Sequence, residues 1–331
     1  MKKKSNLVGD GTPFSAMVTA VRDLRQPKHA EVAMVPEDTR IDGRTCLVTG
    51  ANSGLGKAAA VELARRGGNM ILACRPGHGE ICQEIQKLSG SSNIEYMEVD
   101  LADVKSVHRL CDLLASRRIR IDITLLNAGL MPPRARKSPQ GFEMMFAVHF
   151  LSSRILIDRW LKDGVIRPSR HPGKTPRIVF VASEAHRSSH VIEFDRLGTF
   201  KDYKMKDSLR HYGISKLLQC MYATELSRRL NQGDSIEVAV HSMCPGGISS
   251  NISRDTPTLL KPVVKPLLRY LLQSPEQAVK PAIYLCCSEE AGCSTGIYLH
   301  LMQRKSVSPS TSDPENGSRL WEASAELMAK F

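Results

Sequence analysis

A β-prone run that leads into a glycine-rich loop and then into a helix-forming run most constrains the fold of this chain. Residues 45–48 are mostly apolar, residues 49–56 read T-G-A-N-S-G-L-G, and residues 57–66 are rich in helix formers. Glycines let the backbone turn tightly and approach a pyrophosphate, whose charge is stabilised at the positive end of the following helix. This order predicts a dinucleotide-binding loop, with an ordinary glycine-rich turn as the alternative. The candidate cofactor-binding residues of the loop are Thr49, Gly50, Asn52, Ser53, Gly54, Leu55 and Gly56.

The rest of the chain alternates between runs typical of strands and runs typical of helices. Such alternation favours a parallel sheet with right-handed crossovers. We therefore predict an α/β protein with a single-domain, doubly wound Rossmann fold and a seven-stranded, mostly parallel sheet. The predicted strands are residues 45–49, 69–74, 94–99, 123–127, 177–183, 236–243 and 297–301, and the helices between them include residues 79–87, 104–115, 141–161, 212–230 and 275–286.

The two ends of the chain differ from this pattern. Residues 1–40 show no periodicity and contain several prolines, so we expect a partly disordered N-terminal extension. The Rossmann domain is expected over residues 41–303, with a variable substrate lid at about residues 249–273. Residues 304–331 are rich in serine, proline and aspartate at first and predict a loop followed by a C-terminal helix.

Composition and charge narrow the class of protein. Apolar residues make up 42% of the 331 residues, which is enough for a sizeable core. The net charge of +12 comes from scattered basic residues without an aromatic stacking platform, so we expect no nucleic-acid partner. The chain has no apolar run of about 18 residues that would predict a transmembrane span. Its nine cysteines do not suggest a disulfide framework. We expect a cytoplasmic protein without a metal site, in solution or in peripheral contact with a membrane.

Tyr212 and Lys216 are the strongest candidates for catalysis. Because they are four residues apart in a helix-like run, their side chains would share one helix face. A neighbouring ammonium, together with a bound cationic nicotinamide, can lower a phenol pKa from near 10 to about 7, which requires roughly 4 kcal/mol of differential stabilisation. Tyr212 would then be an acid–base catalyst. The spacing alone is weak, since it also occurs by chance in many helices.

Three motifs in order resemble those of the short-chain dehydrogenase/reductase family: the glycine loop, the run Asn127-Ala128-Gly129, and the Tyr212/Lys216 pair. The resemblance spans about residues 42–328. Other runs resemble the retinol-dehydrogenase-like branch of that family, which handles retinoids and other lipophilic carbonyl compounds. These runs are residues 73–75, 181–186, 212–217 and 320–324.

The resemblance implies roles for residues that follow the predicted strands. Ser183 matches the catalytic serine of the family, whose hydroxyl would hydrogen-bond the substrate carbonyl oxygen. Asp100 matches a position that contacts the adenine ring, with a helix cap as the alternative. The other cofactor-binding residues that the resemblance implies are Leu101, Asn127, Ala128, Gly129, Tyr212, Lys216, Pro245, Gly246 and Ser250.

His149 departs from the family pattern. The run F-A-V-H at residues 146–149 stands where the family usually has F-x-V-N. In relatives the asparagine steadies a water that links the lysine to solvent. A neutral histidine can both donate and accept, so it could hold the same water or carry the proton itself. We therefore include His149 as a catalytic residue of a proton relay. The alternatives are strongly reduced turnover and a different register of this run against the family pattern.

The end of the second predicted strand indicates the cofactor. NAD-selective folds place an acidic residue there, which binds the ribose hydroxyls and would repel a 2′-phosphate. This chain has Cys74 and Arg75 instead. Because a guanidinium matches phosphate geometry, we expect NADP(H) to be favoured over NAD(H), unless Arg75 is only a surface residue.

These residues together predict an NADP(H)-dependent oxidoreductase that transfers a hydride between nicotinamide and a carbonyl or alcohol group. Ser183 and Tyr212 would hold the substrate oxygen, Tyr212 would donate the proton, and Lys216 would bind the nicotinamide ribose and lower the tyrosine pKa. His149 would complete the relay.

The lid segment bears on the substrate. Its apolar residues with interspersed lysines favour a lipophilic aldehyde, ketone or alcohol, or contact with a membrane surface, although a core-packing helix pair explains them equally well. Two alternative functions remain: a cofactor-binding regulatory or scaffold protein with weakened catalysis, and another carbonyl reductase chemistry such as acyl-carrier-protein-linked reduction. The sequence leaves the oligomeric state open, a homo-oligomer included.

Overall fold

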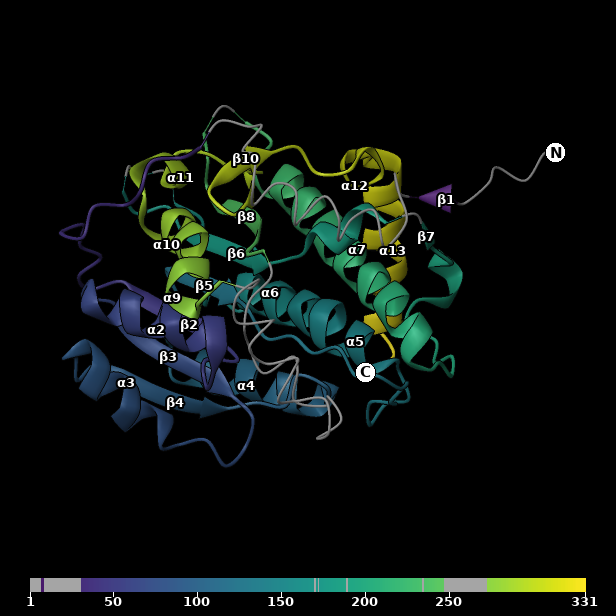
Figure 1. Cartoon of the computed structure of the whole chain (residues 1–331), viewed down its shortest axis with the longest axis horizontal. Coiled ribbons are helices and arrows are strands. Elements are labelled where there is room, and N and C mark those ends of the chain that lie inside the picture. The colour runs from purple at the N-terminus through teal and green to yellow at the C-terminus, as the bar shows by residue number, and fades with distance from the viewer. Residues whose placement is uncertain are drawn as a thin grey trace.

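The computed structural model of the chain describes residues 7–8, 31–169, 171, 173–188, 190–233, 235–246 and 273–331. Its centre is an eight-stranded sheet in the order β10-β9-β8-β6-β5-β2-β3-β4 (Figure 1). All neighbouring strands in it are parallel except β9 and β10. The predicted single-domain Rossmann fold with a mostly parallel sheet is therefore confirmed. The parallel strands are β2 (Thr45–Thr49), β3 (Asn69–Cys74), β4 (Ile94–Glu98), β5 (Ile123–Leu126), β6 (Arg177–Val181), β8 (Ala239–Cys244) and β9 (Tyr298–His300).

The predicted number of seven strands is wrong by one. The eighth strand, β10 (Gln303–Lys305), turns back on β9 through a reverse turn at Leu301, whose φ is 59°. Its three residues are polar, so they carry neither the alternation nor the apolar run from which a strand can be predicted. A separate two-stranded sheet joins β1 (Leu7–Val8) to β7 (His190–Val191).

Helices cover both faces of the sheet, so the side chains of most of its strands are buried on both sides. Successive side chains of β2 point to opposite faces: Cys46 and Val48 pack on one side, and Leu47 packs on the other. The first side is covered by α2 (Gly54–Arg65), α3 (Ile81–Ser89), α9 (Pro275–Ala278), α10 (Lys280–Cys287) and α11 (Glu289–Gly292). The second side is covered by α4 (Val104–Ser116), α6 (Ser152–Lys162) and α7 (Met205–Leu230).

The helix predicted over residues 141–161 contains a local change of geometry. It runs as α5 (Met144–Phe146), a π-helical turn η1 (Ala147–Leu151) and α6. Such turns insert an extra residue into a helix and are frequent at functional sites. The buried His149 lies in this turn.

Helix α7 begins at Met205, so the predicted start at Tyr212 is wrong. Its first turns contain Lys206, Asp207 and Arg210, and the apolar periodicity begins only after them. Tyr212 and Lys216 therefore lie inside a regular helix, where the backbone fixes their spacing.

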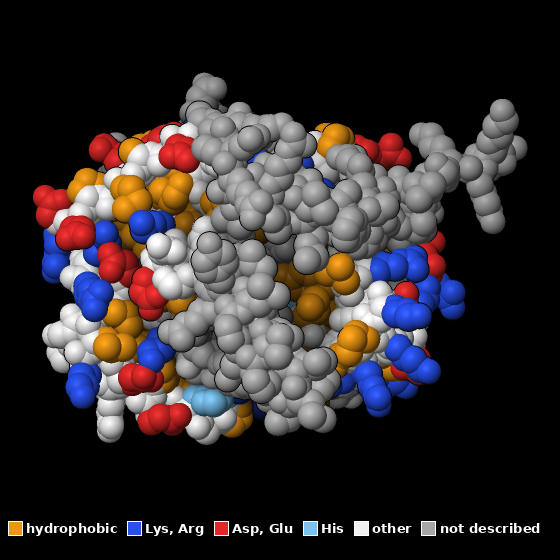
Figure 2. All heavy atoms as spheres, in the orientation of Figure 1, with side chains coloured by type: hydrophobic (Ala, Val, Ile, Leu, Met, Phe, Trp, Pro, Cys, Tyr) orange, Lys and Arg blue, Asp and Glu red, His pale blue; other side chains and the backbone are white. Residues whose placement is uncertain are grey.

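The C-terminal residues form α12 (Pro309–Ser312) and α13 (Pro314–Met328), and α13 lies beside α7 (Figure 1). The domain boundary predicted between residues 303 and 304 lies within β10. In the part of the chain that the structure describes, no helix is long and apolar enough to cross a bilayer. Basic and acidic side chains are interspersed on the face shown in Figure 2.

Candidate active site

The glycine loop leaves β2 at the carboxyl edge of the sheet, where β2 lies between β3 and β5 and the strand order reverses. Gly50 and Gly54 have φ angles of 67° and 55°, which glycine adopts without strain. A Cβ on Gly56 would lie 2.4 Å from both Asn127 Nδ2 and Gly50 O. The side chain of Ser53 does not cap α2. The loop therefore closes tightly on β5 and leads into a helix start suited to a phosphate.

Asn127 and Ala128 fasten the end of β5 to this loop. Their backbone N–H groups donate to Thr49 Oγ1 at 2.9 and 3.1 Å. The Asn127 side chain donates to Thr49 O at 2.9 Å and to Gly50 O at 3.3 Å. The predicted residues of the two motifs thus lie together, and Gly129 follows them in an exposed position.

Arg75 and Asp100 follow β3 and β4 at the same edge. Arg75 is exposed, and its carbonyl accepts a hydrogen bond from Tyr96 at 2.8 Å. The Asp100 carboxylate accepts the N–H of Ala102 at 2.9 Å, next to the buried Leu101. Helix α4 is capped by Asp103, so the alternative that Asp100 is the helix cap is wrong.

Lys216 and Tyr212 face the carboxyl end of β6 from α7. The buried Lys216 Nζ donates to Val181 O at 2.8 Å and to Gln219 Oε1 at 3.0 Å, and it lies 5.8 Å from the Tyr212 ring centroid. Burial lowers the pKa of Lys216 to about 8. Burial raises the pKa of Tyr212 to about 12, and a hydrogen bond with Ser183 opposes this rise. Without a further positive charge, the phenol of Tyr212 therefore keeps its proton near neutral pH.

Ser183 lies directly after β6, at the start of the 3-10 turn η2 (Glu184–Arg187). Its hydroxyl oxygen accepts the N–H of Ala185 at 3.2 Å. Its side chain lowers the pKa of Tyr212, so the two predicted groups for the substrate oxygen lie near each other.

The side chain of His149 packs against the side chain of Tyr212. Its ring meets the Tyr212 ring edge to face, with centroids 5.7 Å apart. Nε2 accepts the N–H of Leu130 at 3.0 Å, so Nδ1 carries the proton and donates to Ser215 Oγ at 2.8 Å. Burial and the charge of Lys216 hold the pKa of His149 well below its usual range. The ring is therefore neutral, and both of its nitrogens have a partner.

Three other predicted features lie near the limit of the described residues. Pro245 and Gly246 follow β8 at the same edge, and Gly246 has a φ of 77°. Ser250 lies outside the described residues, as does the predicted lid at about residues 249–273 except for its last residue, Gln273. Among the described residues, no group of three or more histidine, cysteine or acidic side chains is arranged to hold a metal.

Two residues of this arrangement, Ser215 and Gln219, were not predicted as site residues from the sequence. Ser215 links the His149 ring to the Tyr212 carbonyl, to which its hydroxyl donates at 2.8 Å. Gln219 accepts from Lys216. Each follows a catalytic candidate by three residues in α7, and helical spacing is the signal that could have identified both.

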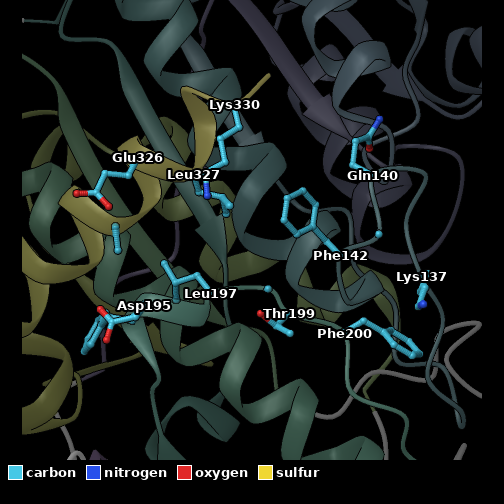
Figure 3. A pocket seen from close by; sticks show the side chains of 14 residues that line it. Lys137, Gln140, Phe142, Asp195, Leu197, Thr199, Phe200, Glu326, Leu327 and Lys330 are labelled. Atoms are coloured by element: carbon cyan, nitrogen blue, oxygen red, sulfur yellow. The ribbon is translucent and has the colours of Figure 1, made fainter.

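A cavity of about 460 Å³ lies elsewhere, between the loop at residues 194–200 and α13 (Figure 3). Phe142, Leu197 and Leu327 line it together with charged side chains such as Lys137 and Glu326. None of its lining residues is a predicted site residue, so it is not the active site proposed from the sequence.

The chain is similar to known proteins in sequence and in structure. Residues 44–192 match the family model described as short chain dehydrogenase. The chain is 36% identical over 306 residues to human retinol dehydrogenase 13, covering 88% of this chain and 87% of that protein. It is 32% identical over 291 residues to dehydrogenase/reductase SDR family member 13 of Bos taurus, covering 86% and 73%. A crystal structure of an uncharacterized Mycobacterium paratuberculosis protein is similar with a TM-score of 0.66 and 25% identity, covering 90% and 98%.

Proposed function

This chain belongs to the short-chain dehydrogenase/reductase family, in its retinol-dehydrogenase-like branch, and is an NAD(P)-dependent oxidoreductase; we propose that it uses NADP(H) to interconvert a lipophilic carbonyl compound and its alcohol. One observation carries the proposal: Ser183, Tyr212 and Lys216 lie near one another at the carboxyl edge of the sheet, where the glycine loop also lies. The seven parallel strands place these groups, which are distant in sequence, side by side.

The residues of the glycine loop fit a dinucleotide. A Cβ at Gly56 would fill the tight space between the loop and Asn127, and the backbone N–H groups at the start of α2 suit a pyrophosphate. When bound, the nicotinamide supplies or accepts the hydride. No carboxylate follows β3, and the exposed guanidinium of Arg75 is available for a 2′-phosphate, which supports NADP(H) as the preferred form.

The catalytic groups of the chain would act on the substrate oxygen. The Ser183 hydroxyl holds this oxygen, and Tyr212 gives it a proton in reduction or takes one in oxidation. The buried ammonium of Lys216 stabilises the phenolate that Tyr212 becomes after it has given its proton. The predicted relay through the His149 ring requires that ring to release either Leu130 or Ser215.

The name of the human relative supports a retinoid-like substrate. A lipophilic aldehyde, ketone or alcohol also fits the apolar composition of residues 257–268, which lie outside the described residues. An acyl-carrier-protein-linked substrate has no specific support in the described residues.

Purified protein incubated with NADPH or NADH and a panel of aldehydes, ketones and retinoids tests the proposal. We expect NADPH oxidation with a lipophilic aldehyde, and a loss of about 10²- to 10⁴-fold in kcat for Tyr212→Phe, because that variant lacks the proton donor. Arg75→Ala should raise KM for NADPH about tenfold and leave KM for NADH unchanged. Oxidation of neither cofactor by any member of the panel would instead favour the scaffold alternative.

A further inference from the structure

The turn η2, directly after Ser183, is bonded to the C-terminal part of the chain. Glu184 is buried and accepts the Tyr298 hydroxyl of β9 at 2.7 Å and Lys305 Nζ of β10 at 3.2 Å. Arg187 pairs with Glu184 at 3.1 Å and also donates to the carbonyl of Ser306. Two charged residues of η2 are thus held by residues 298–306.

His186, between them, connects Ser183 to the same segment. Its ring is fully buried. Nδ1 donates to the Ser183 carbonyl at 2.7 Å, so this nitrogen carries the proton, and Nε2 accepts the N–H of Ser308 at 3.3 Å. The ring packs edge-on against Tyr298, with centroids 5.1 Å apart. The His186 ring therefore links the backbone of Ser183, the candidate catalytic serine, to the backbone of Ser308 in the C-terminal segment.

We propose that His186 is a positioning residue that holds the Ser183 backbone, and through it the Ser183 hydroxyl, against residues 298–308. The proposal rests on the function proposed above, in which Ser183 holds the substrate oxygen.

The geometry of Ser183 explains why such a support matters. The Ser183 carbonyl accepts two donors, the N–H of His186 at 3.0 Å and the His186 ring. Its backbone is extended, with φ of −159° and ψ of 149°, and only the 3-10 turn follows it. These two bonds hold the peptide next to the Ser183 Cα, and a shift of that Cα would move the hydroxyl relative to Tyr212. A misplacement of about 1 Å in an active site can lower the rate about 10²-fold.

Two variants of His186 separate the two hydrogen bonds of its ring. The amide of an asparagine reaches the place of Nδ1 and can still donate to the Ser183 carbonyl. The amide of a glutamine reaches the place of Nε2 and can still accept from Ser308. We expect His186→Gln to lower kcat at least about tenfold with little change in KM for the cofactor, and His186→Asn to restore most of that loss.

Hydrogen exchange gives a second readout that needs no turnover. In His186→Gln, exchange should increase in a peptide covering residues 183–188, whereas in His186→Asn it should increase in a peptide covering residues 306–312. Thermal midpoints of both variants show whether they are folded.

The outcomes distinguish this proposal from the proposed function. If the wild-type protein shows no Tyr212-dependent turnover, the proposed function fails and the exchange pattern alone decides the role of His186. Equal kcat values in wild type and His186→Gln, or the same increase in exchange at residues 183–188 in both variants, would overturn the positioning role.

Discussion

At the scale of single residues, the charge state of Lys216 makes a prediction for the pH dependence of the reaction. Its two hydrogen bonds, to Val181 O and Gln219 Oε1, reach neutral oxygens, and burial lowers its pKa to about 8. The ammonium is therefore charged below about pH 8 and loses its proton above it. We expect kcat/KM for the cofactor, which reports the free enzyme, to be constant at lower pH and to fall above about pH 8.

Lys216→Arg is the matched control for this prediction, because a guanidinium keeps its proton throughout the same range. The variant should be slower but should lack the decline above about pH 8. A decline at the same pH in both proteins would assign it to another group.

His149 makes a second prediction at this scale. A ring whose pKa lies well below its usual range does not titrate near neutrality and is a poor proton carrier there. We expect His149→Asn to leave the shape of the pH profile between about pH 6 and 9 unchanged. It should lower the free energy of unfolding by about 1–3 kcal/mol, because the half-buried N–H of Leu130 loses its acceptor. A pH profile that changes shape would instead support the predicted relay through the ring.

At the scale of elements, the close contact between the glycine loop and β5 can be tested by a substitution that adds one methyl group to Gly56. In Gly56→Ala, the new Cβ would meet Asn127 Nδ2 and Gly50 O at 2.4 Å, and the second of these is backbone that cannot move aside cheaply. We expect at least about a tenfold rise in the cofactor Kd and a lower thermal midpoint. Fluorescence titration with NADPH measures the first, and calorimetry measures the second.

Gly79→Ala is the control for this change, since a Cβ there would meet nothing within 4 Å. It should bind the cofactor as the wild type does. If Gly56→Ala also bound NADPH normally, the loop would not be as closely packed on β5 as described.

Some elements of the candidate site could be predicted from the sequence, and others could not. The loop, β5 and the Tyr212/Lys216 spacing could be predicted because glycine and helical periodicity have local physical causes. The π-helical turn around His149 could not, because it changes the register of a helix without changing its apolar pattern. The polar start of α7 was missed for a similar reason: solvent-exposed helical residues carry no hydrophobic periodicity.

At the scale of the whole molecule, the connections made by the C-terminal region were the least predictable. The sequence indicates a helix there, but it does not indicate that β10 joins the sheet or that residues 298–308 bond to the turn after Ser183. Contacts between distant polar residues such as Glu184 and Lys305 have no local signature, because each partner alone has the sequence context of a surface residue.

The attachment of α13 gives the last prediction. The buried Arg154 of α6 stacks on the Trp321 ring at 4.0 Å, and Arg229 of α7 lies 4.5 Å from the same ring. One aromatic side chain thus joins α13 to both helices on this face of the sheet. Trp321→Ala removes the ring that both guanidinium groups contact, so we expect the free energy of unfolding to fall by about 2 kcal/mol.

Activity should respond differently from stability in this variant. The Trp321 ring packs on α6 and α7 at positions away from Ser183 and Tyr212, so kcat of Trp321→Ala should equal that of the wild type. Guanidinium denaturation measures the loss of stability, and Glu322→Ala, at the exposed neighbouring position, should show none. A fall in kcat of Trp321→Ala without a fall in stability would mean that α13 acts on the active site directly, rather than by holding the helices together.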